Sequence, residues 1–258
     1  MQDATPAALR RFRLDGRVAI VTGASAGLGE AVARALASAG AQVAVVARRL
    51  ERLTTLAEEI SGAAIACDLG DADRLAEVVP QVADRLGPPT ILVNTAGNIF
   101  SSEPAEKESL DDIRRTLDLN LIAPFRLSQD VFPYMLEAGG GAIVHVSSIS
   151  GRVGIHGIPQ ASYAASKMGL SGLTADLAVQ WARHSIRVNT VAPGFFRSEI
   201  TNVLYDTERS ANYLRRNTPL PMEGSADDVV GSVLWLVSDA GRYVTGQTIV
   251  VDGGWTAR

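Results

Sequence analysis

Short apolar runs alternate along the chain with longer segments in which apolar and polar positions are mixed. Most runs are of strand length and apolar at successive positions, which is the pattern of strands buried on both faces. The longer segments have the spacing of amphipathic helices. The pattern predicts strands over residues 17–22, 42–47, 63–67, 90–94, 141–146, 186–191 and 248–252, and helices over 28–39, 50–60, 71–86, 110–137, 162–182 and 226–237, with Pro124 and Pro133 as candidate kinks.

This alternation predicts an α/β fold, namely a single doubly wound Rossmann-type domain with a mainly parallel sheet of about seven strands. No linker rich in Pro and Ser divides the chain, and no repeat of 20–50 residues runs along it. We therefore expect residues 1–13 to form an N-terminal extension and residues 14–258 to form one domain.

The composition excludes several classes of function. Lys and Arg number 24 against 28 Asp and Glu, so a net charge of −4 without a basic block speaks against a nucleic-acid partner. Cys67 is the single cysteine, and the three histidines are too far apart in sequence for a compact metal site. No apolar run reaches the roughly 20 residues of a membrane helix, and residues 1–16 lack a signal-peptide core. A cytoplasmic protein without a metal or a membrane partner is expected.

A glycine-rich turn follows the first predicted strand and opens the first long helix. Backbone N–H groups of such a turn can approach a pyrophosphate, and the helix dipole favours its negative charge. The spacing is Gly-x₃-Gly-x-Gly rather than the best-known dinucleotide fingerprint, and tight packing alone is the competing explanation. The candidate cofactor residues of this turn are Gly23, Ser25, Gly27, Leu28 and Gly29.

The ends of the next three strands carry further candidate cofactor residues. The second strand ends at Arg48 without an acid to bind ribose hydroxyls, so NADP(H) is favoured and NAD(H) remains an alternative. An arginine there is also ordinary on a solvated helix face. At the third strand, Asp68 and its neighbour Leu69 can meet the adenine, or Asp68 can cap the next helix. The fourth strand ends in Asn94, Ala96 and Gly97, which permit close approach of a cofactor but also suit a turn.

The fifth strand ends at Ser148, and the helix that follows carries Tyr163 and Lys167 four residues apart on one face. An ammonium beside a phenol favours phenolate and lowers the pKa of the tyrosine. Such a tyrosine can exchange a proton with an alcohol or carbonyl oxygen, to which the serine can also donate a hydrogen bond. A Tyr-x₃-Lys pair alone is common on solvated helices. Its position after a strand that ends in Ser, within a dinucleotide-binding pattern, favours the catalytic interpretation.

Together these motifs resemble the short-chain dehydrogenase/reductase family over residues 14–254. Residues 22–29 match the family's cofactor turn, 94–97 resemble its Asn-Asn-Ala-Gly motif, and 244–254 resemble its C-terminal strand. The resemblance implies that residues 14–258 are a dinucleotide-binding catalytic domain and that the protein forms a homo-oligomer, a tetramer or a dimer. It also implies catalytic roles for Asn120, Ser148, Tyr163 and Lys167, and cofactor contacts for Tyr163, Lys167, Pro193, Gly194 and Ser198.

Three positions depart from the family pattern. Thr95 replaces the second Asn of the Asn-Asn-Ala-Gly motif, and Ser198 stands where many members have Thr near the nicotinamide amide. Ser148 precedes Tyr163 by 15 residues, where the family commonly has 13. Ser150 has the usual separation, but the local sequence aligns Ser148 better, so the two extra residues are placed in the loop 152–160.

The reaction that the resemblance implies is the interconversion of a secondary alcohol and a ketone by hydride transfer, with Tyr163 as acid/base and Asn120 holding a water in the proton relay. The substrate is a small molecule, with 3-oxoacyl reductases and sugar-acid dehydrogenases as the two related classes. Residues 195–216 are expected to form a lid over it, and Arg152 and His156 are weak candidates for contact with a polar or anionic substrate. A non-catalytic NAD(P)-binding regulatory protein and a nucleotide-dependent methyltransferase are the alternatives from other classes.

Overall fold

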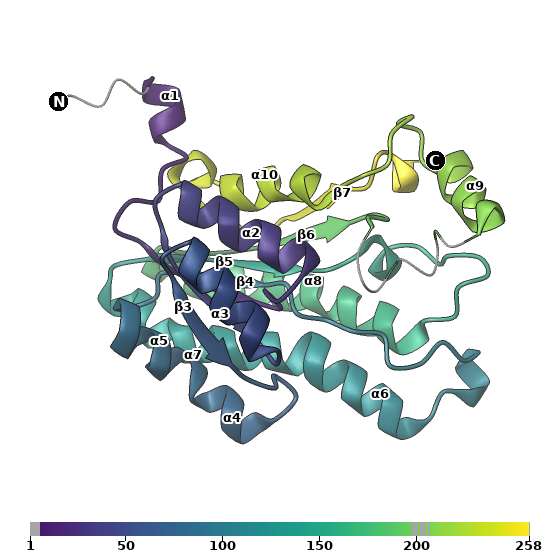
Figure 1. The fold of residues 1–258 in the computed structure, drawn as a ribbon, viewed down its shortest axis with the longest axis horizontal. Coiled ribbons are helices and arrows are strands. Elements are labelled where there is room, and N and C mark those ends of the chain that lie inside the picture. Colours follow the sequence, from purple (N-terminus) through teal and green to yellow (C-terminus); the bar gives the residue numbers. More distant parts are fainter. Residues whose placement is uncertain (1–5, 198–200, 202–204, 206, 258) are drawn as a thin grey trace.

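Seven parallel strands form one sheet in the order β3-β2-β1-β4-β5-β6-β7 (Figure 1). The computed structural model describes residues 6–197, 201, 205 and 207–257. The predicted doubly wound α/β fold is confirmed. The strands are β1 (Val18–Thr22), β2 (Gln42–Ala47), β3 (Ala63–Ala66), β4 (Ile91–Asn94), β5 (Gly141–Val146), β6 (Ile186–Pro193) and β7 (Thr248–Val251).

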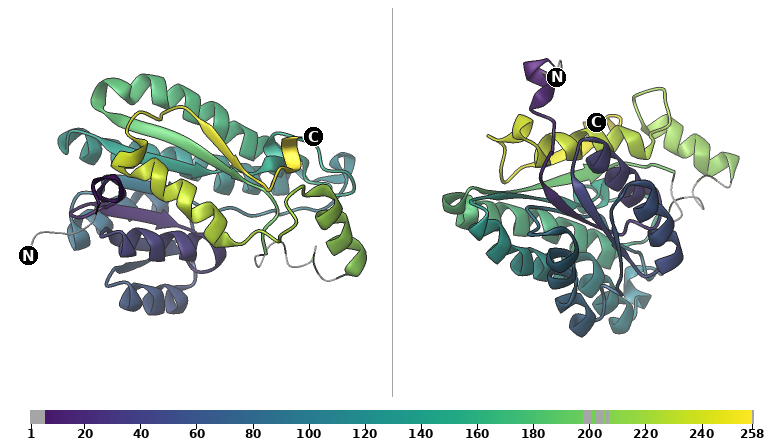
Figure 2. Two further views of the ribbon diagram at one scale, coloured as in Figure 1. Left: turned by 90° about the horizontal axis from the view of Figure 1, so that it is seen from above. Right: turned by 60° about the vertical axis from the view of Figure 1, so that its left-hand side comes forward.

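The central strands are buried on both faces because helices cover the sheet from either side (Figures 1 and 2). Every residue of β1, β4 and β5 is buried, as their apolar runs predict. Helices α2, α3 and α10 pack on one face, and α4, α5, α7 and α8 pack on the other. The helices are α1 (Ala7–Arg10), α2 (Gly27–Ser38), α3 (Leu50–Glu59), α4 (Ala72–Ala76), α5 (Val78–Leu86), α6 (Leu110–Leu117), α7 (Ala123–Glu137), α8 (Ala161–Trp181), α9 (Glu208–Asn217) and α10 (Ala226–Val237).

The segment 71–86, predicted as one helix, forms two helices that meet at Glu77. Pro80 explains the break, because its ring clashes with the carbonyl of the residue four positions earlier, and that residue is Ala76, the last of α4. Asp71 caps α4 by accepting hydrogen bonds from the backbone N–H groups of Asp73 and Arg74, at 3.1 and 3.2 Å. Pro80 is visible in the sequence as a helix breaker, and the prediction of one helix over 71–86 did not take it into account.

The segment 110–137, predicted as one long helix, is divided by a wide π-helical turn at Asp118–Ile122. Pro124 has no N–H to donate to the carbonyl of Asn120, four residues earlier, so regular α-helical bonding cannot pass through this point. Pro124 therefore interrupts the helix as predicted, whereas α7 runs through Pro133 without a break in its assigned span. The wide turn places Asn120 inside the molecule, fully buried.

The predicted lid, residues 195–216, is described only in part, because 198–200, 202–204 and 206 lie outside the described residues. Its described portion includes α9, which lies beside the C-terminal end of the chain in Figure 1. Phe195 and Tyr213 contact Trp255, with ring centroids 4.7 and 5.9 Å away. The aromatic residues of this segment are thus partly engaged in packing, and a lid function stays a prediction.

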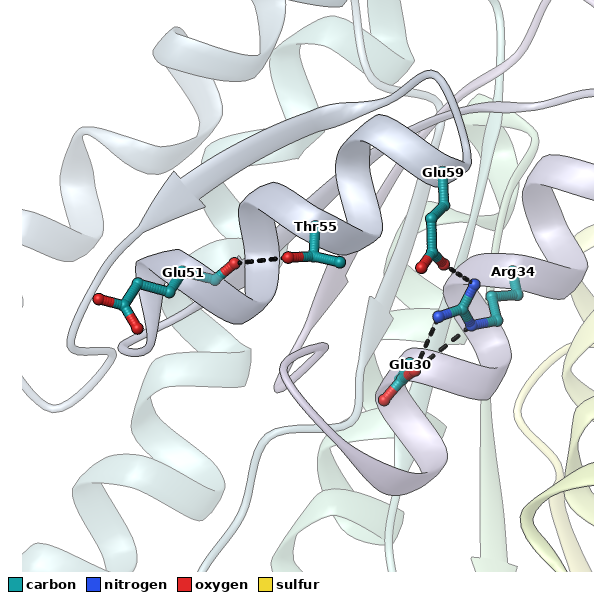
Figure 3. A network of polar contacts seen from close by, with 5 residues as sticks. All are labelled: Glu30, Arg34, Glu51, Thr55 and Glu59. Atoms are coloured by element: carbon teal, nitrogen blue, oxygen red, sulfur yellow. Dashed lines mark hydrogen bonds and ion pairs between the residues drawn. The ribbon is translucent and has the colours of Figure 1, made fainter.

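Arg34 joins the first two helices on one face of the sheet (Figure 3). Its guanidinium bonds Glu30 of the same helix at 2.9 Å and also contacts Glu59 at the end of α3. The hydrogen bonds to these two carboxylates raise the pKa of the arginine. The contact ties α2, which opens at the glycine turn, to α3, which begins directly after Arg48 and Arg49.

Candidate active site

A cleft of about 820 Å³ lies at the carboxyl ends of the strands. The strand order reverses between β1 and β4, and ligands of doubly wound folds bind at such a switch point. The cleft brings together residues predicted from seven separate segments. Of the predicted site residues it is lined by Gly23, Ser25, Gly27, Leu28, Gly29, Arg48, Asp68, Leu69, Ala96, Gly97, Ser148, Tyr163, Lys167, Pro193 and Gly194.

The glycine turn has two kinds of glycine. A Cβ on Gly23 would lie 2.8 Å from the backbone of Ala96, and one on Gly29 would lie 2.4 Å from the carbonyl oxygen of Gly23. Packing alone therefore requires these two. Gly27 has a φ of +60° and opens α2, whose N-cap residue, Ala26, has no side chain that can cap the helix. The first N–H groups of α2 thus remain available to a phosphate at the cleft.

Two arginines that follow β2, Arg48 and Arg49, line the cleft. Both arginines are exposed, and Arg49 donates from Nε and Nη2 to the hydroxyl of Ser25, at 3.1 and 2.9 Å. The prediction named Arg48 and omitted Arg49, although the pair of basic residues was visible in the sequence. Asp68 accepts a hydrogen bond from the N–H of Gly70 at 3.1 Å, and Asp71 rather than Asp68 caps the following helix.

The end of β4 departs from the expected cofactor bed at Asn94. Its side chain is buried, lies outside the cleft lining and bonds Nδ1 of His145 on the adjacent strand at 3.1 Å. Thr95 uses its hydroxyl to bond the carbonyl of Thr22, which fastens β4 to β1. Gly97 packs closely against Lys167, because a Cβ there would lie 2.9 Å from Nζ of the lysine, and the predicted approach of a cofactor to Gly97 stays a prediction.

Ser148 and Tyr163 both line the cleft, and the Ser148 hydroxyl lies close enough to the phenol to lower its pKa. Ser150, the residue at the usual spacing, is buried and instead accepts a hydrogen bond from Nε2 of Gln160 at 3.0 Å. The intervening loop therefore absorbs the longer separation and leaves Ser148 opposite the tyrosine. Ser148 also caps the short 3₁₀ turn Ile149–Gly151, by accepting from the N–H of Ser150 at 3.1 Å.

Lys167 is buried beneath Tyr163 and donates from Nζ to the carbonyl of Val146 at 2.8 Å. Its backbone carbonyl accepts a hydrogen bond from the hydroxyl of Ser147 at 2.6 Å, so the end of β5 is bonded twice to α8. Burial lowers the pKa of the Lys167 ammonium to about 8. The ammonium lies 5.7 Å from the centroid of the Tyr163 ring.

The expected depression of the pKa of Tyr163 is not seen in this structure. Burial raises the pKa of the phenol, and the hydrogen bond from Ser148 only partly offsets this effect. The reason is geometric: the Lys167 ammonium donates to a backbone carbonyl rather than to the phenol oxygen. Burial therefore favours the neutral phenol of Tyr163 over phenolate in this structure.

Asn120 lies behind the cleft rather than on its surface. It exchanges two hydrogen bonds with the backbone of Asn98, at 2.9 and 3.0 Å, and donates to the hydroxyl of Ser166 at 3.1 Å. Ser166 donates in turn to the carbonyl of Tyr163 at 2.7 Å. Neither Asn98 nor Ser166 was predicted, because their contacts depend on the wide turn at Asn120. Ser198 lies outside the described residues.

Comparison with known proteins agrees with this arrangement. A family model described as Enoyl-(Acyl carrier protein) reductase matches residues 23–256, which span the glycine turn and the whole cleft. The chain belongs to the short-chain dehydrogenase/reductase family. A D-threitol dehydrogenase from Mycolicibacterium smegmatis is 37% identical over 252 residues, covering 96% of this chain and 95% of that protein.

Two further members of the family also match most of the chain. The 3-oxoacyl-(acyl-carrier-protein) reductase FabG of Thermotoga maritima is 38% identical, covering 94% of this chain and 99% of its own length. The crystal structure of a gluconate 5-dehydrogenase from Burkholderia cenocepacia, in complex with NADP and tartrate, is 34% identical with a TM-score of 0.92, covering 97% of this chain and 99% of that one. Membership makes this short-chain dehydrogenase/reductase an oxidoreductase acting on CH–OH groups with NAD(P), and sets aside the methyltransferase alternative.

The described residues contain no group of three or more His, Cys, Asp or Glu that could hold a metal ion. Within the same residues, no helix is long and apolar enough to cross a membrane.

Proposed function

We propose that this enzyme interconverts a secondary alcohol and a ketone with Tyr163 as the acid/base and NADP(H) as the favoured cofactor. The observation that carries the proposal is that Ser148, Tyr163 and Lys167 line one cleft, with the buried ammonium of Lys167 5.7 Å from the centroid of the Tyr163 ring. The cleft suits a dinucleotide for two reasons. The start of α2 has no side-chain cap, so its N–H groups can bind phosphate, and the glycines at the cleft have no Cβ that would fill the space.

Each side chain has a distinct part in the proposal. Tyr163 donates its phenolic proton to the carbonyl oxygen in reduction and accepts it from the alcohol in oxidation. Ser148 donates a hydrogen bond to the same substrate oxygen. Lys167 supplies positive charge that favours phenolate once the proton has left. Asn120 holds the water of the proton relay. When bound, the nicotinamide cofactor supplies or accepts the hydride.

The charge at the adenosine end supports NADP(H) over NAD(H). Arg48 and Arg49 line the cleft after β2, and no acid follows the strand there to bind the ribose hydroxyls. Arg49 is already held by Ser25, so its guanidinium is oriented before a 2′-phosphate arrives. The Burkholderia gluconate 5-dehydrogenase carries NADP, which agrees with this assignment.

The substrate proposal has two branches, a 3-oxoacyl thioester and a sugar acid or polyol, as in the relatives named above. NADPH and NADH binding is measured first by fluorescence titration, and a screen of both substrate classes follows. We expect Tyr163→Phe to lower kcat by roughly 10²- to 10⁴-fold while the affinity for NADPH changes little.

A Tyr163→Phe protein that reduces the substrate at the parental rate would contradict the acid/base assignment. A parent that binds NADPH but converts no member of either substrate class would favour the non-catalytic regulator. Tighter binding of NADH than of NADPH would overturn the cofactor proposal alone.

We also propose that the enzyme is a homo-oligomer that uses α8 as a contact surface. One exposed stripe of this helix carries Met168, Gly172, Ala175 and Val179, while its opposite side is buried against the sheet. Val179 is 80% exposed and Met168 is 53% exposed. An apolar stripe on an exposed helix face is a candidate contact surface, and its small residues allow a second helix to approach closely.

A further inference from the structure

The first turn of α8 has no cap of its own. Its N-cap residue is Gln160, whose side chain makes no bond to the helix and instead donates to Ser150 at 3.0 Å. The first turn also contains no acid, although this helix is 21 residues long and its N-terminus carries partial positive charge. Tyr163 is the third residue of the helix, so the way this turn is held decides where the phenol lies.

Glu108, which lies 54 residues before Ser162 in the chain, supplies the missing cap. Its Oε2 accepts a hydrogen bond from the N–H of Ser162 at 3.4 Å, and its Oε1 accepts one from the hydroxyl of Ser162. Ser162 is buried and Glu108 is half-buried, so this contact is shielded from water better than a surface ion pair. A carboxylate here satisfies a backbone donor that the helix leaves unpaired and complements its dipole.

Glu108 also ends a segment that runs along the site between β4 and α6. The segment is bonded at its start through Asn98, which exchanges two hydrogen bonds with Asn120. It is bonded at its end through Glu108 to Ser162, the residue before Tyr163. The same segment carries Phe100, which lines the cleft. One stretch of chain is therefore bonded at both ends to elements that carry catalytic residues.

We propose that Glu108 is a positioning residue for Tyr163: by capping α8 from outside the helix, it holds the phenol against Ser148. Glu108 is not among the residues that line the cleft. The inference deepens the proposed function and rests on it. Because the contact lies at the tyrosine and away from Arg48 and Arg49, its loss acts on proton transfer and spares cofactor binding.

The test compares Glu108→Ala and Glu108→Gln with the parent, and uses Glu106→Ala as the control. Glu106 is an exposed acid two residues earlier, with no hydrogen bond or ion pair to the described residues. A glutamine can accept from the N–H of Ser162 and donate to its hydroxyl, so it retains both contacts without the charge. Alanine retains neither.

Three measurements are made on each protein: kcat, the Kd for NADPH, and the solvent deuterium isotope effect on kcat. We expect Glu108→Ala to lower kcat by roughly 10- to 100-fold, because small displacements of a catalytic group are costly. Its Kd for NADPH stays within about twofold, and its solvent isotope effect rises as proton transfer becomes slower. Glu108→Gln is expected to recover most of kcat, and Glu106→Ala to match the parent.

Amide hydrogen exchange across residues 161–167 gives a readout that needs no turnover. Faster exchange there in Glu108→Ala, restored in Glu108→Gln, is the expected result, and unchanged exchange overturns the proposal even if the parent proves inactive. It is equally overturned if Glu108→Ala retains the parental kcat with only a lower Tm, if Glu108→Gln gives no recovery, or if cofactor affinity falls in parallel with kcat. Failure of the parent itself to convert a carbonyl substrate counts against the proposed function instead.

Discussion

Ser148 and Ser150 are two residues apart, yet their hydroxyls have different partners. Ser148 meets the phenol of Tyr163, whereas Ser150 accepts from Gln160 at the foot of the loop that follows. A hydroxyl that can reach the substrate oxygen stabilises developing charge, and one that closes a loop contributes a single hydrogen bond. Spacing alone would have favoured Ser150, so the identity of the polarising serine depends on how the loop 152–160 folds.

These partners predict different kinetic effects for the two serines. We expect Ser148→Ala to lower kcat by roughly 10²-fold or more, since one preorganised donor to the reacting oxygen is lost. Ser150→Ala is expected to lower kcat by less than about tenfold, because only the bond to Gln160 disappears. Steady-state kinetics on both variants, with NADPH saturating, measure the difference. A larger loss in Ser150→Ala than in Ser148→Ala would reverse the assignment.

At the scale of the element, the last carbonyl groups of α10 have no partners within the helix, and a side chain of β6 donates hydrogen bonds to them. Arg187 projects from β6 and donates from Nη1 to the carbonyl of Leu236 at 2.5 Å and from Nη2 to that of Ser238 at 3.3 Å. A cation at a helix C-terminus complements the dipole and satisfies unpaired carbonyls. Burial lowers the pKa of this guanidinium, and Arg17 lowers it further, while Asp239 acts in the opposite direction.

Removing this cap is predicted to destabilise the whole domain, because α10 packs against α2 and the sheet. We expect Arg187→Met to lower the free energy of unfolding by about 1.5–3 kcal/mol, the range for hydrogen bonds that involve a charged group. Arg242→Met is the control, since Arg242 is exposed and its loss should cost less than about 0.5 kcal/mol. Urea unfolding followed by circular dichroism gives both values, and equal values would rule out the capping role.

At the scale of the whole molecule, buried titratable groups make stability depend on pH. His145 is fully buried, its Nδ1 is paired with Asn94, and burial together with the nearby charge of Lys167 lowers its pKa from 6.5 to about 3. Below pH 6.5 the unfolded chain takes up a proton at this histidine and the folded chain does not, so stability falls as pH falls from 6.5 toward 3.

The predicted contribution of His145 to this slope is up to about 1.4 kcal/mol per pH unit, and it is clearest between pH 6.5 and 5, above the range where most carboxylates titrate. Urea unfolding at a series of pH values measures it. We expect His145→Gln to remove this component, whereas His156→Gln should retain it, because His156 is exposed. A His145→Gln protein with the parental slope would show that other groups cause the pH dependence.

Assembly also belongs to this scale. If the exposed stripe of α8 is an interface, Val179→Glu places a charge at its most exposed apolar position and should shift the protein to a smaller species in analytical ultracentrifugation. Leu9→Glu, at an exposed leucine of α1, is the matched control and should leave the sedimentation coefficient unchanged. A Val179→Glu protein that sediments like the parent would exclude α8 as the contact.

Much of the fold and part of the site were predictable from the sequence by itself. Fully apolar strands such as 141–146 predicted a covered parallel sheet, because only burial on both faces suits such runs. The helical spacing of Tyr163 and Lys167 placed them on one face, and the strand ends placed Ser148, Asp68 and Gly97 at one edge of the sheet. These features follow from local periodicity and from the rule that parallel strands end together.

The tertiary structure alone decided which groups bond to which. The lysine beneath Tyr163 donates to Val146 rather than to the phenol, Asn94 pairs with His145 instead of lining the cleft, and the cap of α8 comes from Glu108. Each of these contacts joins residues far apart in the chain, so it depends on strand register and helix packing rather than on any local pattern. Burial then sets the protonation of the groups brought together, which no residue type determines by itself.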